Sequence, residues 1–191
     1  MIRELKHYPE KARKTVILFV DAMHLVHQTI PGKLWVRRGQ RKMIPTGSGR
    51  KRLTILGALE RGTNRVTALT TEATCDALFF IAFLRIILSA YARKTRIILI
   101  LDNGTYFHAK IVSAFVRATK IELWFLPSSS PNLNLIERFW KFSKGKLVKS
   151  RYHATFRGLQ LSTYSFFRNI CKHRAELKTL LTDKFTILKG C

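Results

Sequence analysis

Acidic residues are scarce in this chain: its 191 residues include only 11 Asp and Glu against 35 Lys and Arg, for a formal net charge of +24. A positive field of this size predicts a polyanionic partner, and nucleic acid fits it better than an acidic protein does. A basic protein that is merely soluble is the alternative. Because carboxylates are so few, those that directly follow apolar runs stand out as candidate functional groups.

Cysteine pairs and long apolar runs are also missing. The chain has three widely spaced cysteines: Cys75, Cys171 and Cys191. They form no CxxC pair, so there is no zinc signature, and they fit a reducing, cytosolic compartment. The charged segment 1–14 has no apolar core of the kind that signal peptides carry. The most apolar stretch, 77–92, is too short to span a membrane and contains Arg85, so we expect no membrane contact.

Length and composition predict one domain with an appendage, because 47% of the residues are hydrophobic and can form a real core. We expect three parts, namely an N-terminal tail at 1–14, a main domain at 15–150 and a C-terminal helical extension packed on it at 151–191.

Apolar runs and turn residues predict a mixed α/β fold. We expect strands at 15–21, 34–36, 53–59 and 65–70, the first three in an antiparallel meander because their connections are short and show no helical period. We expect a helix, a strand, a helix, a strand and a helix to follow at 74–92, 96–101, 107–119, 121–126 and 134–149. One or two helices and a closing apolar stretch at 185–188 complete the chain. This order is that of a ribonuclease-H-like (retroviral-integrase-like) fold, a mixed sheet flanked by helices on both faces.

Three carboxylates occupy notable places in this order. Asp21 and Asp102 each directly follow an apolar strand, and Glu137 lies in the first turn of an expected helix. Functional sites of open α/β sheets lie outside the carboxyl ends of strands. Carboxylate oxygens are the ligands that Mg²⁺ prefers, and two such ions about 3.5–4 Å apart can stabilise both the attacking and the leaving oxygen of a phosphodiester. Asp21 and Asp102 on adjacent strands can bridge two ions, while Glu137 can reach one of them.

Each carboxylate also has an ordinary structural explanation. Asn134 and Glu137 have the spacing of a capping box, in which Glu137 folds back on its own helix. Asp102 followed by Asn103 is a common turn opener, and Asp21 could cap the segment after it. The combination of all three in one chain of this charge favours the functional interpretation.

Three blocks resemble a known family: Val20-Asp21-Ala22-Met23-His24, Leu101-Asp102-Asn103-Gly104-Thr105-Tyr106-Phe107-His108, and Ser130-Pro131-Asn132-Leu133-Asn134-Leu135-Ile136-Glu137-Arg138-Phe139-Trp140. They are similar to the signature blocks of DDE transposases, above all those of bacterial insertion sequences related to the mariner elements. The resemblance implies that Asp21, Asp102 and Glu137 are the metal-binding triad of a DNA hydrolase and strand transferase using two Mg²⁺ or Mn²⁺ ions. It also implies supporting roles for three neighbours: Asn103, His108 and Asn134.

The same resemblance implies double-stranded DNA as partner, as element ends and as target, a dimer on that DNA, and the bacterial cytosol. Asn132 and Leu135 stand where the family usually has Asp and Pro, and neither change touches the triad. Family members usually carry an N-terminal helix-turn-helix, whereas 20 residues precede Asp21 here. We therefore expect an upstream reading-frame product that supplies this region, or a truncated remnant.

Basic residues crowd one segment, which we call the basic loop: Arg37, Arg38, Arg41, Lys42, Arg50, Lys51 and Arg52. We expect it to contact the DNA backbone because few acids lie nearby, and a solvated charge cluster is the alternative. Lys141 and Lys144 lie on the helix face of Glu137 and are expected to meet the phosphates beside the scissile bond. His108 is expected to contact DNA or to orient Asp102, unless it is only a surface histidine.

Three functions fit these observations. The favoured one is the catalytic domain of a transposase. A ribonuclease-H-like nuclease or resolvase that only hydrolyses DNA is the second, and a decayed fragment that binds DNA without turnover is the third. A strand-transfer assay separates the first two.

Overall fold

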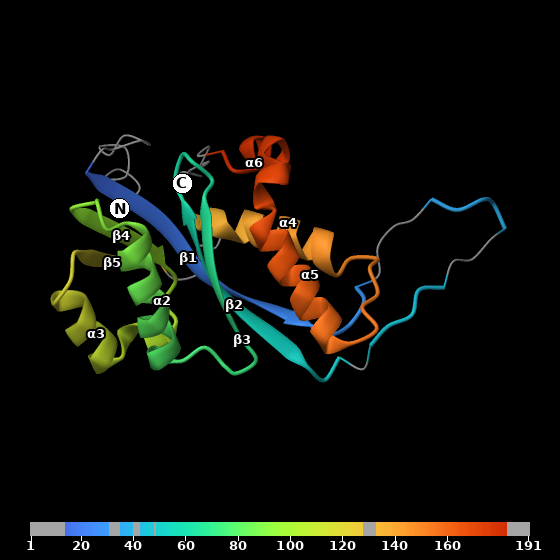
Figure 1. The fold of residues 1–191 in the computed structure, drawn as a ribbon, viewed down its shortest axis with the longest axis horizontal. Coiled ribbons are helices and arrows are strands. Elements are labelled where there is room, and N and C mark those ends of the chain that lie inside the picture. The colour runs from blue at the N-terminus through green and yellow to red at the C-terminus, as the bar shows by residue number, and fades with distance from the viewer. Residues whose placement is uncertain (1–13, 31–34, 40–42, 48, 128–132, 183–191) are drawn as a thin grey trace, which may run out of the picture.

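A five-stranded mixed sheet with helices on both faces forms the centre of the protein (Figure 1). The computed structural model describes residues 14–30, 35–39, 43–47, 49–127 and 133–182. Its elements in chain order are β1 (Thr15–Val26), β2 (Arg52–Glu60), β3 (Val66–Thr71), α2 (Ala77–Ala90), β4 (Arg96–Leu101), the 3-10 helix η1 (Thr105–His108), α3 (Lys110–Arg117), β5 (Ile121–Phe125), α4 (Leu135–Leu147), α5 (Phe156–Arg168), the 3-10 helix η3 (Ile170–His173) and α6 (Arg174–Leu180).

The strand order is β3-β2-β1-β4-β5. β1, β2 and β3 pair antiparallel, while β4 runs parallel to both β1 and β5. Parallel strands in the middle of a sheet are covered on both faces and therefore consist of continuous apolar residues. β4 follows this rule, since every residue from Ile97 to Leu101 is buried. The topology confirms the expected ribonuclease-H-like, integrase-like fold.

Two hydrophobic clusters lie on opposite faces of the sheet, because successive side chains of a strand point to opposite sides. In β1, Leu18 and Val20 face the cluster covered by α2 and α3. Ile17 and Phe19 face the cluster covered by α4, α5 and α6. Figure 1 shows the first helix pair on one side of the sheet and α4 with α5 on the other.

The prediction of a strand at 34–36 is wrong for its two described residues. Trp35 and Val36 are outside any strand, and both side chains are exposed. A short apolar triplet with no neighbouring strand gains neither ladder hydrogen bonds nor burial. The meander instead consists of β1, β2 and β3, so the second strand is the one expected third. Leu34 lies outside the described residues.

β1 is also longer than expected, continuing five residues past Asp21 to Val26. Met23 and Leu25 are buried and His24 is exposed, which extends the period-2 pattern of a half-covered strand. Antiparallel pairing with β2 holds this extension in place. Asp21 therefore lies within a strand and does not end one.

The C-terminal helices share the hydrophobic cluster of α4, to which α5 contributes Leu159 and α6 contributes Leu177. The division of the chain at residue 150 remains a proposal. The tail at 1–13 and the apolar stretch at 185–188 lie outside the described residues. In the part of the chain that is described, no helix has the length and apolarity needed to cross a membrane.

Candidate functional site

Asp21 and Asp102 occupy matching positions on neighbouring strands. The parallel ladder between β1 and β4 pairs Thr15 with Arg96 and ends by pairing Phe19 with Ile100. Asp21 and Asp102 each lie two residues beyond that last pair, Asp21 within β1 and Asp102 directly after β4. Strands in a sheet lie about 4.8 Å apart and residues two positions apart point to the same face. The register therefore brings the two carboxylates together at the carboxyl end of β4, on the face covered by α4.

Glu137 is exposed in the first turn of α4, and the start of that helix is attached to β1. The side-chain amide of Asn134, which is buried, donates a hydrogen bond to the carbonyl oxygen of Val20 (3.3 Å). Asn134 is the N-cap residue, yet its side chain makes no capping hydrogen bond. The capping-box explanation is thus wrong, because the amide of Asn134 joins α4 to the residue that precedes Asp21.

Burial, and after it repulsion between carboxylates, raises the pKa of two of the three acids. The pKa of Asp21 is raised to about 7, chiefly by burial and further by the charges of Asp102 and Glu137. The pKa of Glu137 is also raised, by burial first and by Asp102 second. These shifts show that Asp21 and Glu137 both experience the negative charge of Asp102 in addition to their own burial. Perturbed carboxylates of this kind concentrate at functional sites.

The donor set suits a hard divalent cation. Mg²⁺ takes one or two carboxylates and completes its shell with water and substrate phosphates. The buried Oδ1 atom of Asn134 accepts no hydrogen bond within the described chain, so an oxygen acceptor beside Val20 is left unused. However, in this same part of the chain no three His, Cys, Asp or Glu side chains are close enough to hold one ion. The assignment of Asp21, Asp102 and Glu137 as a shared metal site therefore stays a prediction. Glu137, exposed on a long side chain, is the acid with the most freedom to move.

The loop after β4 is fixed by its own polar residues. The carboxylate of Asp102 accepts a hydrogen bond from the backbone N–H of Gly104 (3.3 Å). This is the bond expected if Asp102 opens a turn. The Asn103 amide donates to the carbonyl oxygen of Leu126 (2.8 Å) and thereby joins this loop to the end of β5. The ring of His108 stacks on Phe125 at 4.2 Å between centroids. Asn103 thus supports the loop directly, while His108 packs on β5.

Sequence reasoning missed three neighbours of Asp21. Gly57 is its register partner on β2. Trp140 lies beside this pair, because a Cβ atom at Gly57 would meet its indole ring, and it lowers the pKa of Asp21. The pKa of Tyr106 is raised by burial first, then by Cys75, and also by Asp102 and Asp21. A signal existed for Gly57, because a lone glycine inside a buried strand indicates close approach of another group.

The structure divides the expected DNA-binding residues into two groups. Arg50, Lys51 and Arg52 are exposed where the basic loop enters β2, and Lys141 and Lys144 are exposed on α4. The two sets meet near His24, whose pKa is lowered by burial and then by the charges of Arg52 and Lys144.

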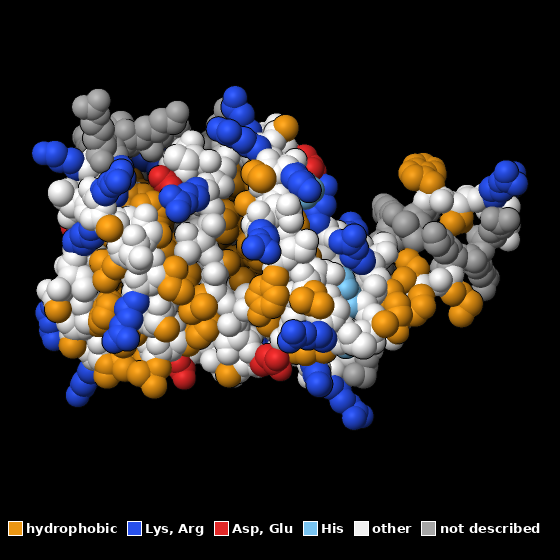
Figure 2. All heavy atoms as spheres, in the orientation of Figure 1, with side chains coloured by type: hydrophobic (Ala, Val, Ile, Leu, Met, Phe, Trp, Pro, Cys, Tyr) orange, Lys and Arg blue, Asp and Glu red, His pale blue; other side chains and the backbone are white. Residues whose placement is uncertain are grey.

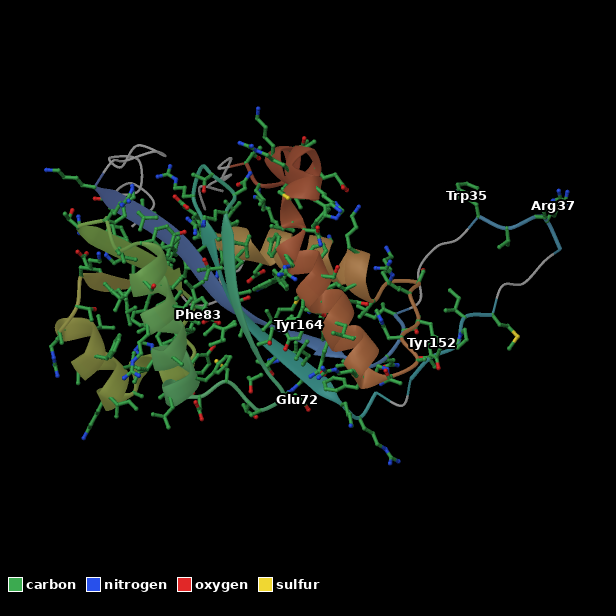
Figure 3. All side chains as sticks on the ribbon, in the orientation of Figure 1. Trp35, Arg37, Glu72, Phe83, Tyr152 and Tyr164 are labelled. Atoms are coloured by element: carbon green, nitrogen blue, oxygen red, sulfur yellow. The ribbon has the colours of Figure 1, made fainter. Side chains whose placement is uncertain are left out.

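The remaining basic-loop residues lie farther out. Arg37 and Arg38 are exposed, and Figure 3 shows Arg37 on a segment that projects away from the sheet. Arg41 and Lys42 lie outside the described residues. Figure 2 shows many more Lys and Arg than Asp and Glu on the visible face, in keeping with the net charge of +24.

Comparison with known proteins assigns this arrangement to a family. A family model described as DDE superfamily endonuclease matches residues 16–160. An uncharacterized 39 kDa protein of insertion element IS630 from Shigella sonnei is 30% identical over 111 residues, covering 58% of this chain and 32% of that protein. The chain thus spans about a third of the length of this curated relative.

Two solved structures share the fold. The Mos1 strand transfer complex has a TM-score of 0.64 at 17% identity, covering 98% of this chain and 59% of that one. The catalytic domain of Mos1 mariner transposase has a TM-score of 0.55 at 13% identity, covering 93% and 85%. Identities this low show the fold alone, but the family model spans most of the sequence and includes all three carboxylates. The chain belongs to the DDE superfamily of endonucleases.

Proposed function

We propose that the chain is the catalytic domain of a DNA transposase, which cleaves DNA at the ends of a mobile element and joins the freed 3′-OH to target DNA. The observation that carries this proposal is the matching register of Asp21 and Asp102 beside Glu137, in a chain of net charge +24. Family membership supports the reaction class, and the positive charge supports DNA as the substrate.

The residues that would hold the metal are Asp21 and Asp102, as ligands shared by two Mg²⁺ or Mn²⁺ ions, and Glu137, as a ligand of one. When bound, the ions supply charge stabilisation to the attacking and leaving oxygens of the phosphodiester. The chain's part is to hold the carboxylates in place, through Asn134 at the start of α4 and Asn103 behind Asp102.

Two displacements of the same type make up the reaction. In the first, a water oxygen bonds to the scissile phosphorus and the bond from phosphorus to the 3′-oxygen breaks, which leaves a 5′-phosphate and a free 3′-OH. In the second, that 3′-OH attacks a target phosphodiester and the target's own 3′-oxygen leaves. Lys141 and Lys144, on the face of α4 that carries Glu137, would hold the flanking phosphates. Arg50, Lys51 and Arg52 would extend this contact along the backbone.

The partners follow from this reaction. We propose that the protein acts on double-stranded DNA in the bacterial cytosol, as a dimer that holds two element ends. An upstream reading-frame product with a helix-turn-helix would supply recognition of those ends, since backbone contacts carry no sequence information.

The test is cleavage and joining of labelled DNA by the purified chain, alone and with an added helix-turn-helix product, in Mg²⁺ or Mn²⁺. We expect metal-dependent nicking and transfer of a 3′-OH end into a target plasmid. Nicking without joining would identify a nuclease that only hydrolyses. DNA binding without nicking under all these conditions would identify a fragment that has lost turnover. Both outcomes overturn the proposal.

A further inference from the structure

Gly57 occupies a position where any other side chain would disturb the site. β2 is buried from Leu53 to Leu59, and Gly57, its one glycine, is the register partner of Asp21. A Cβ atom at Gly57 would lie 2.7 Å from Cζ2 of Trp140 and still closer to the neighbouring Cη2. Real Cβ atoms essentially never approach a neighbour so closely. The indole of Trp140 therefore fills the space that the glycine leaves beside Asp21.

The indole is held in this position on its other sides. Trp140 is buried in α4, 5.2 Å from the ring of Phe139 and 6.4 Å from that of Phe167 between centroids. Its Nε1 atom is buried and forms no hydrogen bond within the described residues. A buried N–H without a partner costs about 1–3 kcal/mol. The indole lies beside Asp21, because it fills the space next to Gly57, the register partner of Asp21, so the Asp21 carboxylate is an acceptor that this N–H can reach by a small shift.

Asn134 supplies a second point of support. Its amide holds the backbone at Val20, one residue before Asp21, while its Oδ1 atom is the other buried side-chain atom without a partner in the described chain. The two unpaired polar atoms thus come from neighbouring turns of the α4 region and lie on the side of β1 that carries Asp21. Unpaired buried polar groups are rare, and two in one place indicate a site whose hydrogen bonds are completed when a ligand binds.

We propose that Gly57 and Trp140 are positioning residues for Asp21: the glycine admits the indole, and the indole N–H, unpaired in the described residues, hydrogen-bonds to one carboxylate oxygen when the other binds a metal ion. This inference rests on the proposed function, because it concerns the ligand that would bridge the two ions. Residues that hydrogen-bond to a metal ligand fix its orientation, and their loss typically costs about 10–100-fold in metal affinity or activity.

The indole N–H itself is the most direct probe, and the chain has three tryptophans, hence three indole signals in a ¹⁵N–¹H spectrum. Trp140→Phe identifies the signal of Trp140. We expect this signal to be slow to exchange with solvent and to shift when Mg²⁺ is added. With Mg²⁺ present, we also expect it to lie upfield of the wild-type position in Asp21→Ala, which removes the acceptor, and in Gly57→Ala, which displaces the ring.

Metal affinity gives the second readout, measured by calorimetric titration with Mn²⁺ alone, in the absence of DNA. We expect Trp140→Phe and Gly57→Ala each to weaken Mn²⁺ binding about 10-fold. The double variant should be little worse than either single one, since both changes remove the same hydrogen bond. Leu177→Ala is the matched control: it removes a buried side chain from the same hydrophobic cluster and should lower the melting temperature without changing Mn²⁺ affinity.

The outcomes separate this inference from the proposed function. If wild type binds Mn²⁺ and nicks DNA, while Trp140→Phe binds Mn²⁺ with wild-type affinity, the positioning role is wrong and the proposed function stands. A Trp140 signal that is unchanged in Asp21→Ala also overturns the positioning role. If wild type neither binds Mn²⁺ nor nicks DNA, the proposed function has failed. Should Gly57→Ala not fold, the Trp140→Phe affinity and the wild-type spectrum still decide.

Discussion

Replacing Asp21 with Asn should make the metal-free protein more stable at neutral and alkaline pH, although it removes a catalytic group. In the folded chain the pKa of Asp21 is raised from 3.8 to about 7, by burial first and then by the neighbouring carboxylates. The folded state therefore keeps a proton that the unfolded chain releases, so stability falls as pH rises from about 4 through about 7. Asn carries no charge at any of these pH values and avoids this loss.

The size of the effect follows from the pKa difference. One pKa unit corresponds to about 1.36 kcal/mol, so the shift of Asp21 amounts to at most about 4 kcal/mol. Partial access to water reduces this figure, and we expect Asp21→Asn to raise the free energy of unfolding by about 2–4 kcal/mol at pH near 8. The gain should shrink as pH falls through 7 and disappear near pH 4, where both side chains are neutral.

Urea unfolding in chelator, followed by circular dichroism from about pH 4 to 8, measures this difference directly. The difference between the two proteins is the relevant quantity, because it cancels the titration of all other groups. Added Mg²⁺ should stabilise wild type and leave Asp21→Asn unchanged. A variant that is less stable than wild type at pH near 8, or a difference that does not vary with pH, would refute the electrostatic description of the site.

Three further changes have distinct expected results. Asp102→Asn should abolish metal-dependent nicking and leave DNA affinity within about twofold of wild type in a gel-shift assay; undiminished nicking would rule out its role as a metal ligand. Replacing Arg50, Lys51 and Arg52 together with Ala should weaken binding about equally for terminal-repeat and scrambled duplexes and flatten the log–log salt slope by about 0.9 per lost phosphate contact; a loss confined to the repeats would show base recognition instead. Lys120→Met should lower the free energy of unfolding by about 2–3 kcal/mol without affecting nicking at low temperature. The reason is that the Lys120 ammonium donates hydrogen bonds to the carbonyl oxygens of residues 91, 92 and 94, just after α2. An unchanged denaturant midpoint would contradict this prediction.

The order of strands and helices was predictable because apolar runs and helical periods are local signals. β4 illustrates this, since its six residues were bounded correctly from the apolar run alone. The strand expected at 34–36 failed for the opposite reason: a short apolar triplet has no local signal that tells whether a partner strand lies beside it. The end of β1 was misplaced because Asp21 interrupts the apolar run, while pairing with β2 continues the strand beyond it.

In the candidate site, too, some features could be predicted from local sequence and others only from the fold. Asp21 and Asp102 could be chosen from the sequence because each follows an apolar run, and α4 could be placed from its period. The register that aligns the two aspartates is a property of the sheet and could not be derived from either segment alone. The contact of Gly57 with Trp140 joins residues far apart in the chain, so the sequence carries no local signal that places the indole beside Asp21.

Anomalous diffraction from crystals grown with Mn²⁺ and a DNA end is the most direct test of the central claim, because it locates the ions themselves. The account predicts two Mn²⁺ peaks about 3.5–4 Å apart, with Asp21 and Asp102 among the ligands and Glu137 moved in to bind one ion. Strong Mn²⁺ peaks that are ligated by other residues, in a protein that still cuts DNA, would contradict the assignment of all three carboxylates.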